Sequence, residues 1–130
     1  WDAECKMQEL VDKSEAFVRS NFNLWGVLRT VRIHGNIMDR GAQFYDHTDE
    51  DPNDAGNYDG AKRTYVGDLF LNDDYGGGDF VFQVAGKVTK FKPKAGSLVI
   101  FPGYNTVHGI NPIISGRRLN IMSILHDIKS

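Results

Sequence analysis

The distribution of β-forming residues constrains the fold of this chain more than any other feature. From residue 28 onward, short runs rich in valine, isoleucine, phenylalanine and threonine are separated by glycine, proline, asparagine and aspartate. Such runs are typical of strands, and the residues between them are typical of turns. We expect eight strands, at residues 28–37, 42–48, 64–71, 79–84, 87–92, 97–101, 107–111 and 118–126. Eight short strands predict a mainly β protein, built as a sandwich or a barrel.

The segment before these strands has a different periodicity. Between residues 3 and 20, apolar side chains follow helical spacing, at Met7, Leu10, Val11, Phe17 and Val18. This spacing predicts one amphipathic helix that packs along a sheet. A chain of 130 residues can bury a core as a single domain (residues 1–130), whose strands we place at about residues 28–127. The chain starts at Trp1 and not at a methionine, so we expect it to be part of a longer protein.

The charged residues and the cysteine exclude several classes of protein. The 15 basic and 17 acidic residues give a net charge of −2, which provides no general attraction to nucleic acid or to an anionic membrane. Cys5 is the only cysteine, so neither an internal disulfide nor a cysteine-rich zinc site is possible. No apolar run approaches the length of a membrane span, and no signal-peptide pattern is present. We therefore expect no membrane partner, and the cytoplasm is the default compartment.

A histidine and a carboxylate stand two residues apart at the end of the second expected strand. Side chains at positions i and i+2 of a strand point to the same face, so His47 and Asp49 can converge on one point. One imidazole and one carboxylate are two of the three ligands of a two-histidine, one-carboxylate iron site. The pair alone is a weak signal, because a structural histidine is commoner than a ligand. Far downstream, His108 is followed ten residues later by the basic residue Arg118.

These residues lie in an ordered set of segments that resembles a known family. The set is similar to the iron(II)- and 2-oxoglutarate-dependent dioxygenases, most closely to their prolyl 4-hydroxylase-like branch, over roughly residues 31–125. The matching segments are His47-Thr48-Asp49, Leu69-Phe70-Leu71-Asn72, Tyr75-Gly76-Gly77-Gly78-Asp79-Phe80, Pro93-Lys94-Ala95-Gly96-Ser97-Leu98-Val99-Ile100-Phe101, His108-Gly109-Ile110-Asn111-Pro112 and Gly116-Arg117-Arg118. Members of this family fold as a double-stranded β-helix, or jelly roll, which agrees with eight expected strands and one N-terminal packing helix.

The resemblance implies a role for each candidate residue. His47, Asp49 and His108 would be the catalytic metal ligands and would bind Fe(II). 2-Oxoglutarate would bind the metal through its keto-acid end, and its far carboxylate would pair with Arg118, because a planar guanidinium can bind a carboxylate through two hydrogen bonds. The implied reaction uses O2, is supported by ascorbate, and yields succinate and CO2. The implied substrate is a protein or peptide, with proline as the expected target.

One departure from the family concerns the hydroxyl group that helps to hold 2-oxoglutarate. Prolyl hydroxylases commonly place a tyrosine just before the Leu-Asn pair, whereas this chain has Phe70 there. Either another residue supplies the missing hydroxyl or the pocket differs. Tyr45 is the expected donor, because strand alternation places it on the same face as His47. Alternation also allows only one of Arg117 and Arg118 to enter the barrel, and the spacing from His108 favours Arg118.

A long polar connection follows the first histidine and carboxylate. Residues 50–62 contain four acidic residues, one lysine and almost no apolar side chain. Loops of this length inside a domain are usually binding loops, lids or disordered segments. If the loop closes over a substrate, its negative charge should favour peptides with lysine or arginine near the target residue.

Two other functions stay open on the sequence alone. Nucleic-acid oxidative demethylases use the same barrel, and Arg118-Leu119-Asn120 matches the start of their arginine motif, but Ile124 stands where a second arginine is needed. A catalytically silent jelly-roll module of a larger assembly would also fit the size of the chain, although the complete set of expected ligands argues against it. A cupin-type zinc site would usually need three histidines and a glutamate. The sequence does not indicate the oligomeric state.

Overall fold

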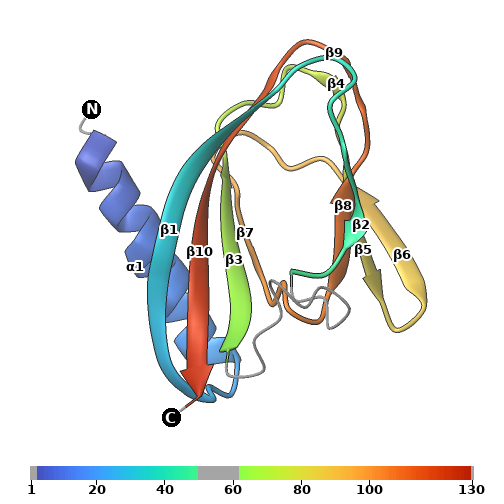
Figure 1. The fold of residues 1–130 in the computed structure, drawn as a ribbon. Helices are drawn as coiled ribbons and strands as arrows, with labels where there is room; N and C mark the ends of the chain where they lie inside the picture. Colours follow the sequence, from blue (N-terminus) through green and yellow to red (C-terminus); the bar gives the residue numbers. More distant parts are fainter. Residues whose placement is uncertain (1–2, 50–61, 130) are drawn as a thin grey trace.

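Two antiparallel sheets of four strands each face one another across the interior of the molecule (Figure 1). The computed structural model describes residues 3–49 and 62–129. The first sheet has the strand order β1-β10-β3-β7, and the second has the order β2-β8-β5-β6. The short pair formed by β4 and β9 joins the two sheets at the top of the view. This arrangement is a jelly roll, which confirms the predicted fold class.

One helix precedes the strands. It is α1 (Ala3–Asn21). The strands are β1 (Gly26–Met38), β2 (Phe44–His47), β3 (Lys62–Phe70), β4 (Gly76–Gly77), β5 (Phe80–Val84), β6 (Lys87–Phe91), β7 (Leu98–Phe101), β8 (Val107–Ile110), β9 (Ile113–Ser115) and β10 (Arg118–Lys129). All eight expected strands are present, with no bound shifted by more than three residues. The two strands that sequence analysis missed are β4 and β9, which are too short to show an alternating pattern. Within the described residues, no helix combines the length and apolar character needed to cross a membrane.

Aromatic rings fill the space between the two sheets. Phe70 and Phe101 from the first sheet and Phe80 from the second form one buried cluster with Val66. The ring of Phe80 stacks on that of Phe82 at 4.7 Å and meets that of Phe101 edge-on at 5.7 Å. Aromatic pairs at such distances add stabilisation beyond the area they bury. This cluster holds the two sheets, and therefore their strand ends, in a fixed relation.

Helix α1 covers the outer face of the first sheet (Figure 1). Val18 of the helix packs with Leu28, Tyr65 and Leu125 in a second buried cluster. Strands β3 and β10 are thus covered on both faces, by the helix on one side and by the second sheet on the other. This double cover explains why β10 alternates poorly between apolar and polar residues.

Candidate metal centre

The two histidines of the predicted metal site are paired across neighbouring strands. His47, the last residue of β2, is the direct register partner of His108 in β8. Residues directly opposite in antiparallel strands bring their side chains close together, and here the ring centroids lie 4.5 Å apart. The strand pairing thus brings together two residues that are 61 positions apart in the sequence.

Asp49 completes this group from just beyond the end of β2. Its Oδ1 lies 3.5 Å from His47 Nε2 and 3.4 Å from His108 Nε2. The ligand atoms of the three side chains all lie within 4.8 Å of one another. Two imidazoles and one carboxylate at this separation form a donor set that suits a borderline divalent metal such as iron.

Hydrogen bonds to the backbone fix the state of both imidazoles. His47 Nδ1 lies 2.7 Å from the carbonyl oxygen of Tyr45, and His108 Nδ1 lies 2.7 Å from that of Thr106. A carbonyl oxygen only accepts, so each Nδ1 carries the proton and donates. In the neutral imidazole this leaves the lone pair on Nε2, which in both residues is the atom that faces Asp49. Both histidines are therefore prepared to bind a cation through Nε2.

A glycine makes room for the carboxylate. The backbone N–H of Asp49 donates to the carbonyl oxygen of Gly103 at 2.9 Å. A Cβ atom at position 103 would overlap the Asp49 carboxylate. The loop between β7 and β8 thus holds Asp49 from outside the strand, in a place that only glycine leaves free.

The charges of the three groups are coupled. Burial raises the pKa of Asp49, but His108 and His47 in their protonated forms donate hydrogen bonds and carry positive charges that outweigh this effect and lower the pKa to about 2. The hydrogen bond to Asp49 likewise raises the pKa of His47 above its ordinary value, although partial burial opposes the rise. The carboxylate is therefore ionised at neutral pH and available to a metal ion.

The predicted cation for 2-oxoglutarate lies inside the barrel. Arg118 is 0% exposed, whereas the side chain of Arg117 is 59% exposed and its Nε donates to Asp39 Oδ1 at 2.7 Å. The structure thus orients this pair as the spacing predicted. Arg118 Nη1 has weak contacts with Asn120 Oδ1 at 3.3 Å and Met38 Sδ at 3.4 Å. Its Nε and Nη2 are buried without a hydrogen-bond partner among the described residues.

A buried carboxylate that sequence analysis missed lies beside these groups. Asp68 on β3 is 1% exposed, and its Oδ1 accepts a 2.6 Å hydrogen bond from Asn120 Nδ2. Burial raises the pKa of Asp68 to about 6, although the hydrogen bond from Asn120 and the charges of Arg118 and His108 oppose the rise. The alternation of Val66, Asp68 and Phe70 along β3 could have revealed that this carboxylate faces the interior.

The structure does not bring Tyr45 into the interior. Its side chain is 80% exposed, and its hydroxyl oxygen accepts a long hydrogen bond of 3.4 Å from Gln43. The predicted role of Tyr45 as a 2-oxoglutarate ligand therefore stays a prediction. The acidic segment expected to bind basic peptides lies outside the described residues, except for Lys62 at the start of β3.

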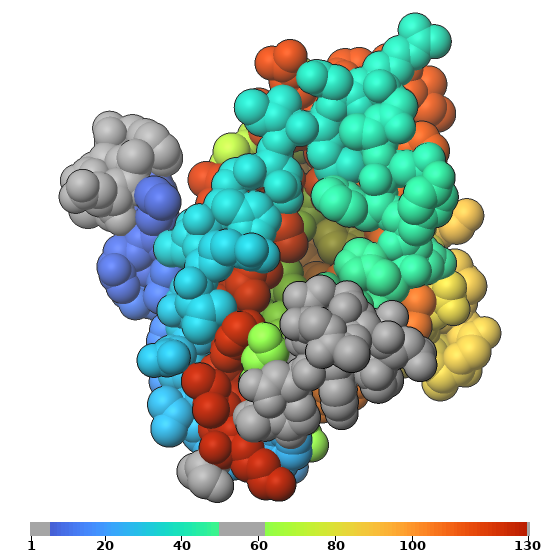
Figure 2. Space-filling model, in the orientation of Figure 1, coloured from blue at the N-terminus to red at the C-terminus, as the bar shows by residue number. Residues whose placement is uncertain are grey.

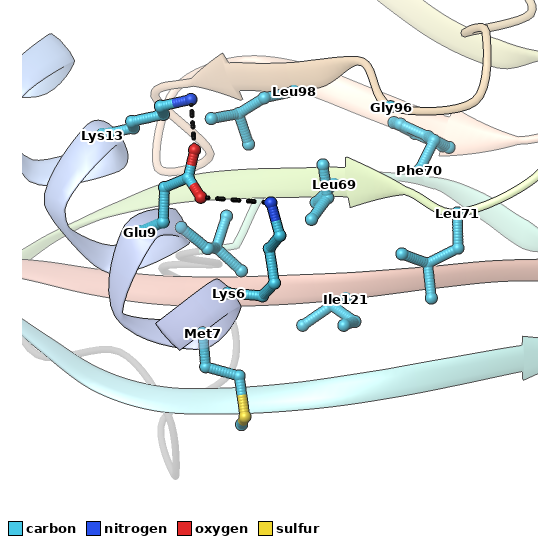
Figure 3. Close-up of a pocket in the computed structure, with 11 residues that line it drawn as sticks. Lys6, Met7, Glu9, Lys13, Leu69, Phe70, Leu71, Gly96, Leu98 and Ile121 are labelled. Atoms are coloured by element: carbon cyan, nitrogen blue, oxygen red, sulfur yellow. Dashed lines mark ion pairs between the residues drawn. The ribbon is translucent and has the colours of Figure 1, made fainter. Parts of the chain in front are cut away.

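Two hollows can be distinguished in the molecule. Figure 2 shows a recess between the cyan atoms of β1 and the green atoms around β2, where the interior opens between the sheets. A separate cavity of about 420 Å³ lies between α1 and the outer face of the first sheet, with Leu10, Leu69 and Ile121 in its lining. Glu9 forms ion pairs with Lys6 and Lys13 at this cavity (Figure 3). None of the three metal-site side chains lines the second cavity.

The comparison with known families agrees with this geometry. Residues 33–126 match the sequence model of the 2OG-Fe(II) oxygenase superfamily. The chain belongs to this superfamily. The resemblance to prolyl 4-hydroxylase-like oxygenases inferred from the sequence is therefore confirmed at the level of the family.

Two curated relatives share part of this oxygenase. A PKHD-type hydroxylase of Colwellia psychrerythraea (strain 34H) is 42% identical over 52 residues, which are 38% of the oxygenase and 23% of that protein. Prolyl 3-hydroxylase 3 of Homo sapiens is 40% identical over 60 residues, which are 43% of the oxygenase and 8% of that protein. The matched segments thus span less than a quarter of either relative.

Solved structures share the fold of the oxygenase over most of its length. The viral collagen prolyl hydroxylase vCPH from Paramecium bursaria Chlorella virus-1, solved as a 2OG complex, has a TM-score of 0.71 at 22% identity. The alignment covers 91% of the oxygenase and 70% of the viral chain. This likeness establishes the shared jelly roll.

Proposed function

We propose that this oxygenase is an Fe(II)- and 2-oxoglutarate-dependent dioxygenase that hydroxylates a protein or peptide at proline. The observation that carries the proposal is the convergence of His47, Asp49 and His108 on one point, with Nδ1 of each histidine bonded to a backbone carbonyl and Nε2 facing the carboxylate. Bound iron and 2-oxoglutarate would supply oxygen insertion from O2 into a C–H bond, with succinate and CO2 as co-products.

The metal-binding residues would act as a fixed donor set. The backbone carbonyls of Tyr45 and Thr106 hold the two imidazoles with Nε2 toward the carboxylate, so binding requires little reorganisation. Phe101 and Phe82 lie against the His108 ring, at centroid distances of 4.7 and 6.4 Å. These rings would limit the access of water to the metal from the interior side.

Arg118 would bind the far carboxylate of 2-oxoglutarate. Its two unbonded nitrogens can donate a pair of hydrogen bonds to a carboxylate, which is the strongest arrangement available to a guanidinium. The Phe70 ring lies 4.7 Å from the Arg118 guanidinium carbon and keeps this charge away from water.

The substrate class rests on the named relatives. The similar proteins include a PKHD-type hydroxylase, a prolyl 3-hydroxylase and a viral collagen prolyl hydroxylase. Two of these names specify prolyl hydroxylation, which supports a proline-containing peptide as the substrate class. The recess between β1 and β2 is where such a peptide would approach the metal.

A coupled turnover assay tests this proposal. The purified chain receives Fe(II), ascorbate and 2-oxoglutarate, and succinate is measured with and without a library of proline-containing peptides. We expect succinate formation that selected peptides stimulate. The absence of succinate under all conditions would instead favour a catalytically silent module.

The metal assignment has its own control. His108→Ala removes one of three ligands, so we expect its Fe(II) affinity to fall at least tenfold and its succinate formation to disappear. Full metal affinity and full activity in this variant would show that His108 is not a ligand.

A further inference from the structure

Orphaned polar atoms gather at one place in the barrel. Among the described residues, four buried side-chain nitrogen or oxygen atoms lack a hydrogen-bond partner. One is His34 Nδ1, and the other three are Arg118 Nε, Arg118 Nη2 and the hydroxyl oxygen of Tyr75. Burying a polar atom without a partner is destabilising, so three such atoms together indicate a binding position for a polar ligand.

Tyr75 and Arg118 lie close together although they are 43 positions apart in the sequence. Met38 packs against Tyr75 in a buried cluster and also receives a contact from Arg118 Nη1 at 3.4 Å. The Tyr75 side chain is 4% exposed, and Arg118 acts on the pKa of its hydroxyl both through its charge and as a side-chain hydrogen-bonding neighbour. No contact between the two groups has the geometry of a regular hydrogen bond. The hydroxyl and the guanidinium therefore face the same space.

Glycines fix the position of the Tyr75 ring. A Cβ atom at Gly78 would come within 3.0 Å of the ring, and one at Gly116 would come within 3.2 Å of the Tyr75 Cα atom. Lys92 donates to the Tyr75 carbonyl oxygen, and its ammonium group lies 4.2 Å from the ring centroid. The ring is thus held from several sides, and its hydroxyl has a defined direction.

The Tyr75 hydroxyl is in the protonation state that a hydrogen-bond donor requires. Burial raises the pKa of its hydroxyl above the ordinary value, although Arg118 partly offsets the rise. The hydroxyl is therefore protonated at neutral pH and can donate to an anion that also accepts from Arg118.

We propose that the Tyr75 hydroxyl donates a hydrogen bond to the far carboxylate of 2-oxoglutarate, beside Arg118. This inference rests on the proposed function and deepens it, because it assigns the hydroxyl that Phe70 cannot supply. It places that donor on the turn before β4, and it makes Tyr75 a determinant of selectivity for a 2-oxo acid with a second carboxylate. The exposed Tyr45 is the alternative donor.

Binding measurements without turnover test this assignment. The chain is loaded with Ni(II), and two probes are titrated by calorimetry: 2-oxoglutarate, and 2-oxopentanoate, which has the same carbon chain without the far carboxylate. Tyr75→Phe should weaken 2-oxoglutarate binding about tenfold, as expected for the loss of a hydrogen bond to a charged group. Binding of 2-oxopentanoate should change by less than about twofold. Tyr45→Phe is the matched control and should leave both affinities unchanged.

The stability of the ligand-free chain provides a second readout. Among the described residues the Tyr75 hydroxyl makes no regular hydrogen bond in the ligand-free barrel, so Tyr75→Phe should melt no lower than the unsubstituted chain. A purely structural role predicts the opposite result, with a lower melting temperature and an equal loss of both probes.

The outcomes separate the two proposals. Unchanged 2-oxoglutarate affinity in Tyr75→Phe, or an equal loss of both probes, would overturn the assignment of Tyr75 while leaving the proposed function intact. A tenfold loss in Tyr45→Phe alone would transfer the role to Tyr45. Failure of the unsubstituted, Ni(II)-loaded chain to bind 2-oxoglutarate would overturn the proposed function and this assignment together.

Discussion

Arg117 and Arg118 have the same side chain but opposite surroundings. Arg117 is exposed and forms an ion pair with Asp39. Water and dissolved salt screen the attraction between these two charges. Arg118 is completely buried with two unbonded nitrogens, so an anion that reaches it meets a desolvated charge. Interactions with a desolvated charge are much stronger than those at the surface.

The two arginines should therefore differ in their effect on co-substrate use. Arg118→Ala removes the buried cation proposed to pair with the 2-oxoglutarate carboxylate, and we expect the 2-oxoglutarate requirement to rise at least about tenfold, or about 1.4 kcal/mol. Arg117→Ala should change it little. A titration of succinate formation against 2-oxoglutarate measures both variants, and the reverse ranking would assign the role to Arg117.

Asp68 should make the stability of the metal-free chain depend on pH. Its pKa is raised to about 6 in the folded chain from an ordinary value of 3.8. Between pH 3.8 and pH 6, the Asp68 carboxyl group is therefore mostly protonated in the folded state and mostly ionised in the unfolded state. The stabilisation from this group is therefore complete below about pH 4 and is lost as the pH rises through 6, by roughly 3 kcal/mol. Asp68→Asn cannot titrate, and its Oδ1 can still accept from Asn120.

Urea denaturation of the metal-free chain between pH 4 and 7 measures this effect. The difference in unfolding free energy between Asp68→Asn and the unsubstituted chain should grow in favour of the variant as the pH rises. A difference that stays constant across this range would show that Asp68 has an ordinary pKa.

At the scale of single elements, the contact between α1 and β3 depends on small residues. Ser14 of the helix lies over Gly67, and its Oγ is 3.2 Å from Ser123 Oγ on β10. A Cβ atom at position 67 would overlap Ser14 Oγ and come within 2.9 Å of Ser123 Oγ. The helix lies close to the sheet here because position 67 carries no side chain.

Gly67→Ala should push α1 away from the sheet and lower the unfolding free energy by about 1–3 kcal/mol, the usual cost of overpacking. Gly35→Ala on β1 is the matched control, because its Cβ atom would meet only the Asn120 carbonyl oxygen at 3.8 Å. Chemical denaturation of both variants checks the prediction. An equal effect in the two would show that the close contact at Gly67 relaxes without cost.

Strand β2 shows a limit of prediction from residue alternation. Regular alternation predicted the strands well, but the face of Tyr45 relative to His47 could not be predicted in this way. The pairing of β2 with β8 has an irregularity between Phe44 and His47, and an extra residue in one strand shifts the side chains that follow it. Nothing in the residue types of this segment indicates that shift.

At the scale of the whole molecule, the sequence could predict the jelly roll and the three side chains that converge as a candidate metal site. Strand periodicity and turn residues are local signals, and the family motifs place His47, Asp49 and His108 in order. The polar interior could not be predicted, because Asp68 on β3 and Arg118 on β10 become neighbours only through strand pairing, and Tyr75 reaches Arg118 from the turn before β4. Their proximity is a property of the topology and not of any segment.

Metal and co-substrate should stabilise the molecule, because they bind only the folded barrel. With Ni(II) saturating the site and 2-oxoglutarate at about 100 times its dissociation constant, the co-substrate should contribute about 2.7 kcal/mol. For a chain of this size that corresponds to a rise in melting temperature of roughly 10 °C. Thermal denaturation measures the rise, which EDTA should reverse. A similar rise in His108→Ala would contradict the metal site.

The incompletely bonded guanidinium of Arg118 should make the lifetime of this protein depend on the supply of 2-oxoglutarate. In a barrel without 2-oxoglutarate, the buried Nε and Nη2 of Arg118 have no hydrogen-bond partner among the described residues, so transient opening should be easier than in a filled barrel. Proteases act on opened molecules, and their rate follows the population of the open form when opening is fast. Where 2-oxoglutarate is scarce, the chain should therefore be degraded faster, and the amount of enzyme should fall together with the supply of its own co-substrate.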